Sequence, residues 1–119
     1  MNSITIVIAD TQHLIRAGLR HLMSKRESFN VVAEADNEAE LMSALQQHTP
    51  DVVVLDYNQS ASFSISTIER IKAKHPDTRI MIMTDDEEKE RIYQVLQLGV
   101  NCFLTKECGE EEVLDAIKA

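Results

Sequence analysis

The sequence has no tryptophan, only three glycines and two prolines, and fewer basic than acidic residues among its 119 positions. Lysine and arginine number 12 against 20 aspartates and glutamates, so the formal net charge is −8. Because phosphate contacts need clustered Lys and Arg, this balance argues against nucleic-acid binding through the segment's own surface. Neither an internal repeat nor a Gly/Ser/Pro-rich linker is visible, so we expect one domain over residues 1–119.

The two cysteines, Cys102 and Cys108, have no second pair and no histidine at zinc-ligand spacing. We therefore expect free thiols in a reducing compartment rather than a disulfide or a zinc site. The start, MNSITIVIAD, lacks a basic segment and has only a short apolar run, which excludes a signal peptide or membrane span there. With 44% hydrophobic and 27% charged residues, the composition is typical of a soluble globular domain, and we expect a cytoplasmic location.

Apolar runs typical of strands alternate with helical periodicity along the whole chain. The predicted strands are 4–9, 29–35, 51–56, 79–84 and 101–105. Helices are predicted between and after them, at about 14–23, 38–48, 65–75, 85–99 and 110–118. Asn37 is a plausible N-cap with Glu40 placed as in a capping box, and Gly99 is a plausible C-cap. Five consecutive βα units favour a parallel sheet with helices on both faces, because right-handed crossovers leave few alternatives.

The strands 4–9 and 51–56 are the most uniformly apolar and are predicted to be central. The second of them, within PDVVVLD (50–56), ends on the carboxylate of Asp56, which is costly to bury without a partner. In sheets of this kind, ligands bind outside the carboxyl ends of the strands. The polar residues expected at that edge are Asp10, Thr11, Asp56, Thr84 and Lys106. A site built for chemistry is therefore the favoured explanation for Asp56.

The segments IADTQHLIRAGL, DVVVLD, IMIMT and GVNCFLTKE, in this order and spacing, resemble the receiver domain of two-component response regulators. The R-x-G-L pattern at 16–19 and the acidic residue after Lys106 are similar to the NarL/LuxR-type subgroup. The resemblance covers the whole chain. It implies a flavodoxin-like fold with strand order 2-1-3-4-5, and phosphoryl transfer from a histidine kinase to an aspartate.

The resemblance implies that Asp56 is the phosphoacceptor. Asp10, Asp56 and the backbone carbonyl of Asn58 would hold Mg²⁺, a cation that prefers hard oxygen ligands and neutralises the charge that accumulates on phosphorus. The family usually has a second acid after the first strand, where this sequence has Thr11. We therefore expect weak Mg²⁺ binding, and Asp85 or Asp86 is the alternative source of the missing charge.

The resemblance further implies that Thr84 donates a hydrogen bond to the phosphoryl group and that Lys106 forms an ion pair with it. Phe103 would be the aromatic residue that reorients on activation. Two more departures from the family pattern are the loop YNQSASFS (57–64), without proline or glycine, and Asp85 directly after Thr84. These departures keep open a pseudo-receiver, a protein-interaction module that works without phosphate. A flavodoxin-like cofactor-binding protein is disfavoured because no Gly-rich loop follows the first strand.

The resemblance also implies partners. A histidine kinase would donate the phosphoryl group, and the domain would form a homodimer through its first and last helices or through the face of the fourth helix, last strand and last helix. The chain would not be an enzyme in the turnover sense, although it would catalyse its own phosphorylation and dephosphorylation. The abrupt end, EEVLDAIKA, suggests a domain cut from a longer protein, in which a C-terminal helix-turn-helix domain would bind DNA.

Overall fold

The computed structural model describes residues 3–56, 63–84, 89–105 and 109–118. In this described part of the chain, five strands alternate with five helices. The elements are β1 (Ile4–Ala9), α1 (His13–Met23), β2 (Phe29–Ala35), α2 (Glu38–His48), β3 (Val52–Asp56), α3 (Ile65–Lys74), β4 (Arg79–Thr84), α4 (Lys89–Gln97), β5 (Cys102–Thr105) and α5 (Glu110–Lys118). The strands form one parallel sheet of order β2-β1-β3-β4-β5, which confirms the predicted flavodoxin-like topology.

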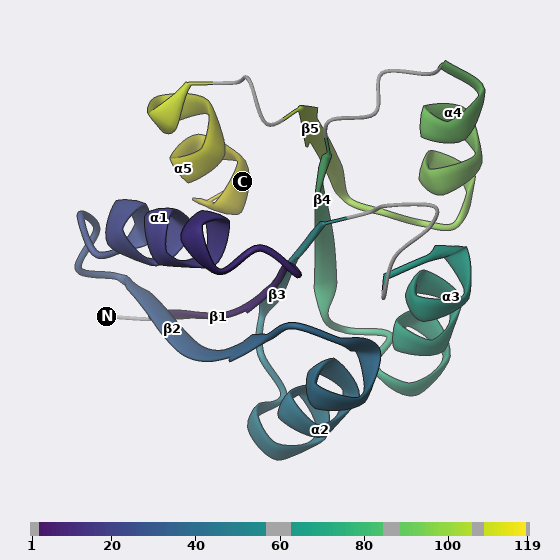
Figure 1. Ribbon diagram of the computed structural model, residues 1–119, viewed down its shortest axis with the longest axis horizontal. Coiled ribbons are helices and arrows are strands. Elements are labelled where there is room, and N and C mark those ends of the chain that lie inside the picture. Colours follow the sequence, from purple (N-terminus) through teal and green to yellow (C-terminus); the bar gives the residue numbers. More distant parts are fainter. Residues whose placement is uncertain (1–2, 57–62, 85–88, 106–108, 119) are drawn as a thin grey trace.

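The sheet is the middle of three layers. Helices α1 and α5 cover one face, and α2, α3 and α4 cover the other (Figure 1). Successive side chains of a strand point to opposite faces, so the interior strands divide their apolar residues between two cores. The core under α1 and α5 takes Ile6, Ile8, Val52, Val54, Met81 and Met83 from the sheet. The core on the other face takes Val7, Ala9, Val53, Leu55, Ile80 and Ile82.

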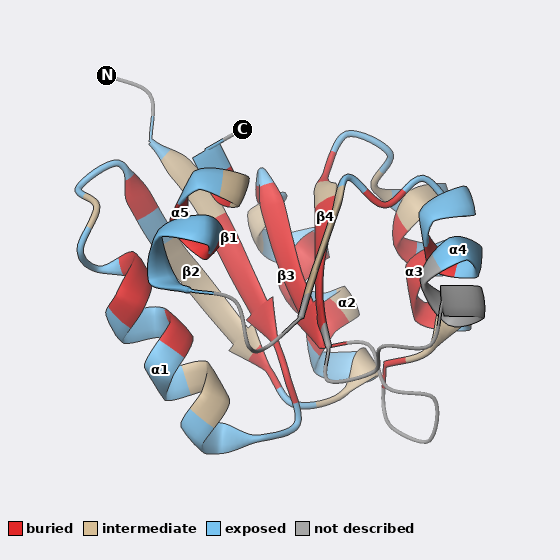
Figure 2. Ribbon diagram, turned by 90° about the horizontal axis from the view of Figure 1, so that it is seen from above, coloured by how far each residue is buried: buried red, intermediate tan, exposed pale blue. Residues whose placement is uncertain are grey.

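Strand β3 is the centre of the sheet and is buried along its whole length (Figure 2). A parallel strand with helices on both faces has no solvent-facing side, which explains the unbroken apolar run Val52–Leu55. Strand β1 lies beside β3, so both strands that were predicted to be central are interior strands. The polar end of β3, Asp56, therefore lies at the middle of one edge of the sheet.

Strand β2 contains an irregularity opposite β1. Ile6 is aligned with Val31, whereas the next residue, Val7, is aligned with Ala33, so Val32 is the extra residue of a β-bulge. One extra residue changes the face to which every later side chain of the strand points. Beyond the bulge, Glu34 is aligned with Ile8 and lies on the face covered by α1.

The helix ends follow local capping signals. Asn37 caps α2 by accepting a hydrogen bond from the backbone N–H of Glu40 at 2.8 Å. The reciprocal bond differs from the expected capping box, because Glu40 accepts from the backbone N–H of Asp36 rather than from that of Asn37. Gly99 has φ of +92°, a conformation that costs little without a side chain, and it ends α4 as expected.

The element bounds agree closely with the sequence prediction. Differences of one residue occur at α1, β3, α3 and β5, and the largest difference is at α4. Strand β3 begins at Val52 rather than Asp51, whose carboxylate turns to bind Thr5. The helix expected over 85–99 is described as α4 over Lys89–Gln97, and residues 85–88 lie outside the described part of the chain. Among the described residues, no helix is long and apolar enough to cross a membrane.

Candidate functional site

Two aspartates follow neighbouring strands at the same edge of the sheet. The register aligns Ala9 of β1 with Leu55 of β3, so Asp10 and Asp56 are the next residues of two adjacent parallel strands. Both are buried, with exposed fractions of 2% and 7%. Burying two like charges side by side is costly, so this pair is the strongest sign of a functional site in the described structure.

Asp10 is held by its backbone and by its side chain. Its N–H donates to the carbonyl of Ala35 at 3.1 Å, which extends the β1–β2 pairing by one residue. Its carboxylate accepts from the backbone N–H of Gln12 at 2.8 Å, and its carbonyl accepts from Nη1 of Arg16 at 2.5 Å. The turn between β1 and α1 is thereby fixed at three points, while Thr11 is exposed within it.

The register also places the remaining predicted positions along this edge. Asp56 is aligned with Met83 of β4, so Thr84 follows one residue later, and Thr84 is aligned with Thr105 of β5. The side chain of Thr84 lies outside the described part of the structure. Asn58, Asp85, Asp86 and Lys106 lie outside the described residues altogether.

Phe103 is placed by β5. It is aligned with Ile82, is half-buried, and packs against the core on the face of α2, α3 and α4. Phe103 therefore lies on the strand next to the one that ends at Thr84, and its side chain is in partial contact with this core.

The donor set fits a divalent cation that prefers oxygen. Asp10 and Asp56 supply two hard carboxylates whose mutual repulsion a dication would relieve. Within the described residues, however, no group of three or more His, Cys, Asp or Glu side chains could hold a metal ion. The exposed hydroxyl of Thr11 adds no charge. Asp10 and Asp56 are thus the described acids of this site, while Asp85 and Asp86 lie outside the described residues, and weak Mg²⁺ binding stays a prediction.

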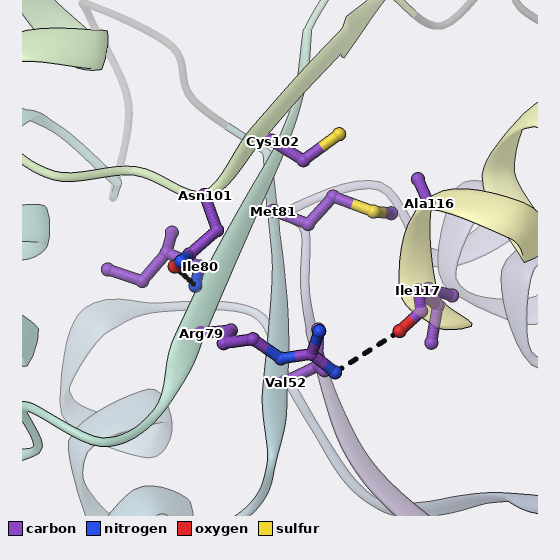
Figure 3. Close-up of a pocket in the computed structure, with 8 residues that line it drawn as sticks. All are labelled: Val52, Arg79, Ile80, Met81, Asn101, Cys102, Ala116 and Ile117. Carbon is purple, nitrogen blue, oxygen red and sulfur yellow. Dashed lines mark hydrogen bonds between the residues drawn. The ribbon is translucent and has the colours of Figure 1, made fainter. Parts of the chain in front are cut away.

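One cavity of the described structure lies elsewhere. It has a volume of about 260 Å³ and lies at the amino ends of β3, β4 and β5, against the last turn of α5 (Figure 3). Arg79 points along this cavity and donates to the carbonyl of Ile117 at 3.2 Å, while Asn101 accepts from the backbone N–H of Ile80 (Figure 3). The polar groups of this cavity close helix and strand ends, and the two buried aspartates do not line it.

Cys102 also lines this cavity. Burial raises the pKa of its thiol, which keeps the sulfur protonated at neutral pH and makes it a poor nucleophile. Cys102 is a free thiol, as expected, and Cys108 lies outside the described residues.

Sequence reasoning missed one residue of this edge, Arg16. Its guanidinium contacts the carbonyl of Asp10 and pairs with Glu34 of β2, with Nε 3.3 Å from Oε1. The available signal was the R-x-G-L pattern, which marked the subgroup but gave no role to the arginine. Glu34 could not be identified from the sequence because the bulge in β2 decides to which face it points.

Comparisons with known proteins give a consistent result. The family model of the response regulator receiver domain matches residues 6–118. The nitrate/nitrite response regulator protein homolog of Haemophilus influenzae is 29% identical over 117 residues, which cover 98% of this chain and 56% of the relative. The probable transcriptional regulatory protein NarL of Mycobacterium tuberculosis is 30% identical over 114 residues, which cover 96% of this chain and 53% of the relative. The chain thus spans about half the length of these curated relatives.

A solved structure agrees with the sequence matches. The signal receiver domain of the putative response regulator NarL from Mycobacterium tuberculosis superimposes with a TM-score of 0.87 at 29% identity. The superposition covers 100% of this chain and 99% of that one.

Proposed function

Because the chain belongs to the response regulator receiver family, with relatives of the NarL/LuxR type, we propose that it is a phosphorylation-controlled switch whose phosphoacceptor is Asp56. The observation that carries this proposal is the position of Asp56. It is buried at the carboxyl end of the central strand and directly beside the second buried acid, Asp10. A carboxylate that served only to end a strand would be more stable in water.

The proposed reaction is a phosphoryl transfer. An oxygen of the Asp56 carboxylate attacks the phosphorus of a phosphohistidine on a kinase. The new O–P bond forms as the N–P bond breaks, and the imidazole leaves, so the product is an acyl phosphate. Thr84 donates a hydrogen bond to the transferred group, and Lys106 offsets its negative charge.

Asp10 and Asp56, with the backbone carbonyl of Asn58, would hold Mg²⁺, and Thr11 takes the place of a second acid beside Asp10. When bound, the cation neutralises negative charge on the phosphoryl oxygens. Thr84 and Lys106 would orient the phosphoryl group, and the kinase supplies the phosphohistidine that donates it. The domain then acts on itself alone, so it is not an enzyme that turns over a separate substrate.

The switch is proposed to run from Thr84 to Phe103. Thr84 and Phe103 lie on neighbouring strands, and Phe103 is only half-buried, which leaves its ring room for a second orientation. A hydrogen bond from Thr84 to the phosphoryl group would favour one orientation. The change is a shift between two populations of the same fold.

The output is proposed to be self-association through α1 and α5. Leu14 of α1 has an exposed fraction of 82%, the largest among the exposed large hydrophobic residues of the described structure. It stands at a groove of about 250 Å³ between α1 and α5, which Gly18 keeps open. The groove reaches Met83, the residue aligned with Asp56, so this face lies next to the proposed acceptor. Exposed apolar surface of this kind is typical of an association surface.

Sedimentation tests this face. With acetyl phosphate and Mg²⁺, the dimer fraction is expected to rise in wild type and to stay low in Leu14→Ser. Leu96→Ser is the matched control, because Leu96 is the exposed leucine of α4 on the opposite face. Association that depends on Leu96 rather than Leu14 would assign the output to the α4 face.

The whole protein is proposed to be a cytoplasmic transcriptional regulator. Its relatives carry names of that kind and are about twice as long as this chain. With a net charge of −8, residues 1–119 are poorly suited to phosphate contacts, so DNA binding would belong to a C-terminal helix-turn-helix domain. Extending the reading frame beyond Ala119 tests this point, and an unrelated downstream domain would overturn it.

The phosphoacceptor is tested by intact mass after incubation with acetyl phosphate and Mg²⁺. Wild type is expected to gain one phosphoryl group, and Asp56→Ala to gain none. Asp51→Asn is the matched control, because Asp51 precedes the same strand that Asp56 ends, at the opposite edge of the sheet. A phosphoryl group that persists in Asp56→Ala would overturn the assignment.

A second candidate function is a pseudo-receiver that binds partners without phosphate. Thr11 favours it, since the described residues then lack a third acid for the metal. The same mass experiment separates the two functions. A wild-type protein that gains no phosphoryl group from acetyl phosphate or from a phosphorylated kinase, yet still self-associates, is a pseudo-receiver.

A further inference from the structure

The arginine of the R-x-G-L pattern lies next to the proposed metal site but is not one of the expected metal ligands. The first turns of α1 carry Arg16, whose side chain is only 13% exposed. Its Nη1 donates to the backbone carbonyl of Asp10 at 2.5 Å, while its Nη2 lies 3.3 Å from Nδ1 of His13. Most surface arginines extend into solvent, so a mostly covered one that donates to this turn has a specific local role.

Glu34 of β2 anchors the arginine from the other side. One carboxylate oxygen of Glu34 lies 3.3 Å from Nε of Arg16, and the other lies 2.6 Å from Nη1 of Arg20. Arg20 is 63% exposed and pairs with Glu34, whereas Arg16 contacts Asp10 and Glu34 together. The guanidinium of Arg16 therefore ties the β1–α1 turn to the strand beside it.

We propose that Arg16 is a positioning residue for the cation site: with Glu34 as its anchor, it fixes the turn after β1 so that the Asp10 carboxylate is presented to the metal. This inference rests on the proposed function, because it concerns the metal site of that function. Arg16 acts through Asp10 and does not itself bind the cation or the phosphoryl group.

Position and charge predict opposite effects of Arg16 on metal binding. A positive charge close to a dication site weakens cation binding, so removal of the charge alone would strengthen it. Loss of the hydrogen bond to Asp10 would loosen the turn and weaken binding. Outer residues that orient metal ligands typically change metal affinity by tenfold or more when they are replaced, so the positional effect is expected to dominate.

The experiment compares Arg16→Gln, Arg16→Lys and Arg20→Gln in the 119-residue chain. Gln removes the charge and the fork-shaped group, whereas Lys keeps the charge but offers a single nitrogen that cannot bond Asp10 and Glu34 in the same geometry. Arg20→Gln is the matched control, because it removes one positive charge that pairs with the same carboxylate of Glu34, from a side chain that is 63% exposed. Mg²⁺ affinity is measured by NMR titration, and folding is checked by thermal unfolding.

Both Arg16 variants are expected to bind Mg²⁺ about tenfold more weakly than wild type, and Arg20→Gln to stay within about twofold. The amide of Gln12, which donates to the Asp10 carboxylate, is expected to exchange its hydrogen faster in the Arg16 variants without any metal present. The exchange rate of the Gln12 amide is compared with the rates of β3 amides in the same protein. A general loss of stability would raise both rates, so this measurement still tests the proposal in a less stable variant.

Unchanged or stronger Mg²⁺ binding in Arg16→Gln, or unchanged Gln12 exchange in both Arg16 variants, would overturn the inference and leave the proposed function standing. Where the wild-type affinity is too low to titrate, the three replacements are made in a Thr11→Asp background. Absence of Mg²⁺ binding in both wild type and Thr11→Asp would instead overturn the metal site and this inference together.

Discussion

The two edges of the sheet use polar residues in opposite ways. At the amino edge, where the strands begin, polar side chains bond to backbone groups of neighbouring elements. Asp51 accepts from the N–H and hydroxyl of Thr5, Thr78 donates to the carbonyl of Pro50, and Arg79 donates to that of Ile117. At the carboxyl edge, where the strands end, two acids are buried beside each other.

The amino edge therefore contributes to the stability of the fold, whereas the carboxyl edge carries residues that lower stability and serve the chemistry. A hydrogen bond between a buried hydroxyl and a backbone carbonyl stabilises the folded state by about 1 kcal/mol. Two neighbouring buried carboxylates destabilise it, unless other groups or a bound cation offset their charge. Replacements at the two edges should therefore change stability in opposite directions.

The largest expected effect concerns Thr11 at the carboxyl edge. Thr11→Asp adds a unit of negative charge next to Asp10. At an effective dielectric of about 20, two unit charges about 4 Å apart attract each other by roughly 4 kcal/mol. If desolvation offsets half of this attraction, Mg²⁺ binding becomes about thirtyfold tighter. Phosphorylation by acetyl phosphate should be faster as well. Titration of both proteins by calorimetry measures the affinity.

Thr11→Ser is the matched control and should bind Mg²⁺ as wild type does. If wild type already binds as tightly as Thr11→Asp, another acid supplies the missing charge, and Asp85 or Asp86 is the first to replace.

The next effect is at the amino edge. Thr78 is only 5% exposed, and its hydroxyl donates to the carbonyl of Pro50 at 3.0 Å. Thr78→Val keeps the shape but leaves this buried carbonyl without its partner, so the free energy of unfolding should fall by about 1–2 kcal/mol. Urea denaturation measures the loss. Thr78→Ser, which keeps the hydroxyl, should lose less, and Mg²⁺ affinity should not change in either variant.

The smallest effect has the opposite sign. Asp10→Asn keeps the oxygen that accepts from Gln12 and removes one of two neighbouring charges. Like charges on adjacent strands repel each other, and nearby groups offset part of this repulsion. The free energy of unfolding in metal-free buffer should therefore rise by about 1 kcal/mol. A fall instead would mean that Asp10 stabilises the fold and that the two edges do not differ.

Much of the fold and part of the site follow from the sequence. The strands 4–9, 29–35 and 79–84 have the predicted bounds because each is a mainly apolar stretch flanked by polar residues. The closeness of Asp10 and Asp56 follows from the parallel order, since Asp10 directly follows one interior strand and Asp56 ends its neighbour.

The rest depends on contacts between distant segments. Arg16 could be placed near the carboxyl edge by its position in α1, but its pairing with Glu34 needs the bulge at Val32, which no local pattern marks. Glu40 accepts from the backbone N–H of Asp36 instead of the expected N–H of Asn37, because the reach of the side chain, and not the spacing in the sequence, selects the donor. The roles of Thr84 and Lys106 stay predictions, as do those of Asn58 and Phe103.

Because of the bulge in β2, the pairing of this strand with β1 decides whether Glu34 faces Arg16. If β2 kept its length and paired with β1 without the bulge, Ala33 would align with Ile8, and Glu34 would point toward α2 and away from Arg16. Deletion of Val32 would remove the bulge and keep Glu34 opposite Ile8. A relative whose second strand has the same length but pairs without this bulge could therefore keep every expected ligand and lose the anchor of its first turn. For this family, the pairing of the second strand deserves the same scrutiny as substitutions among the acids.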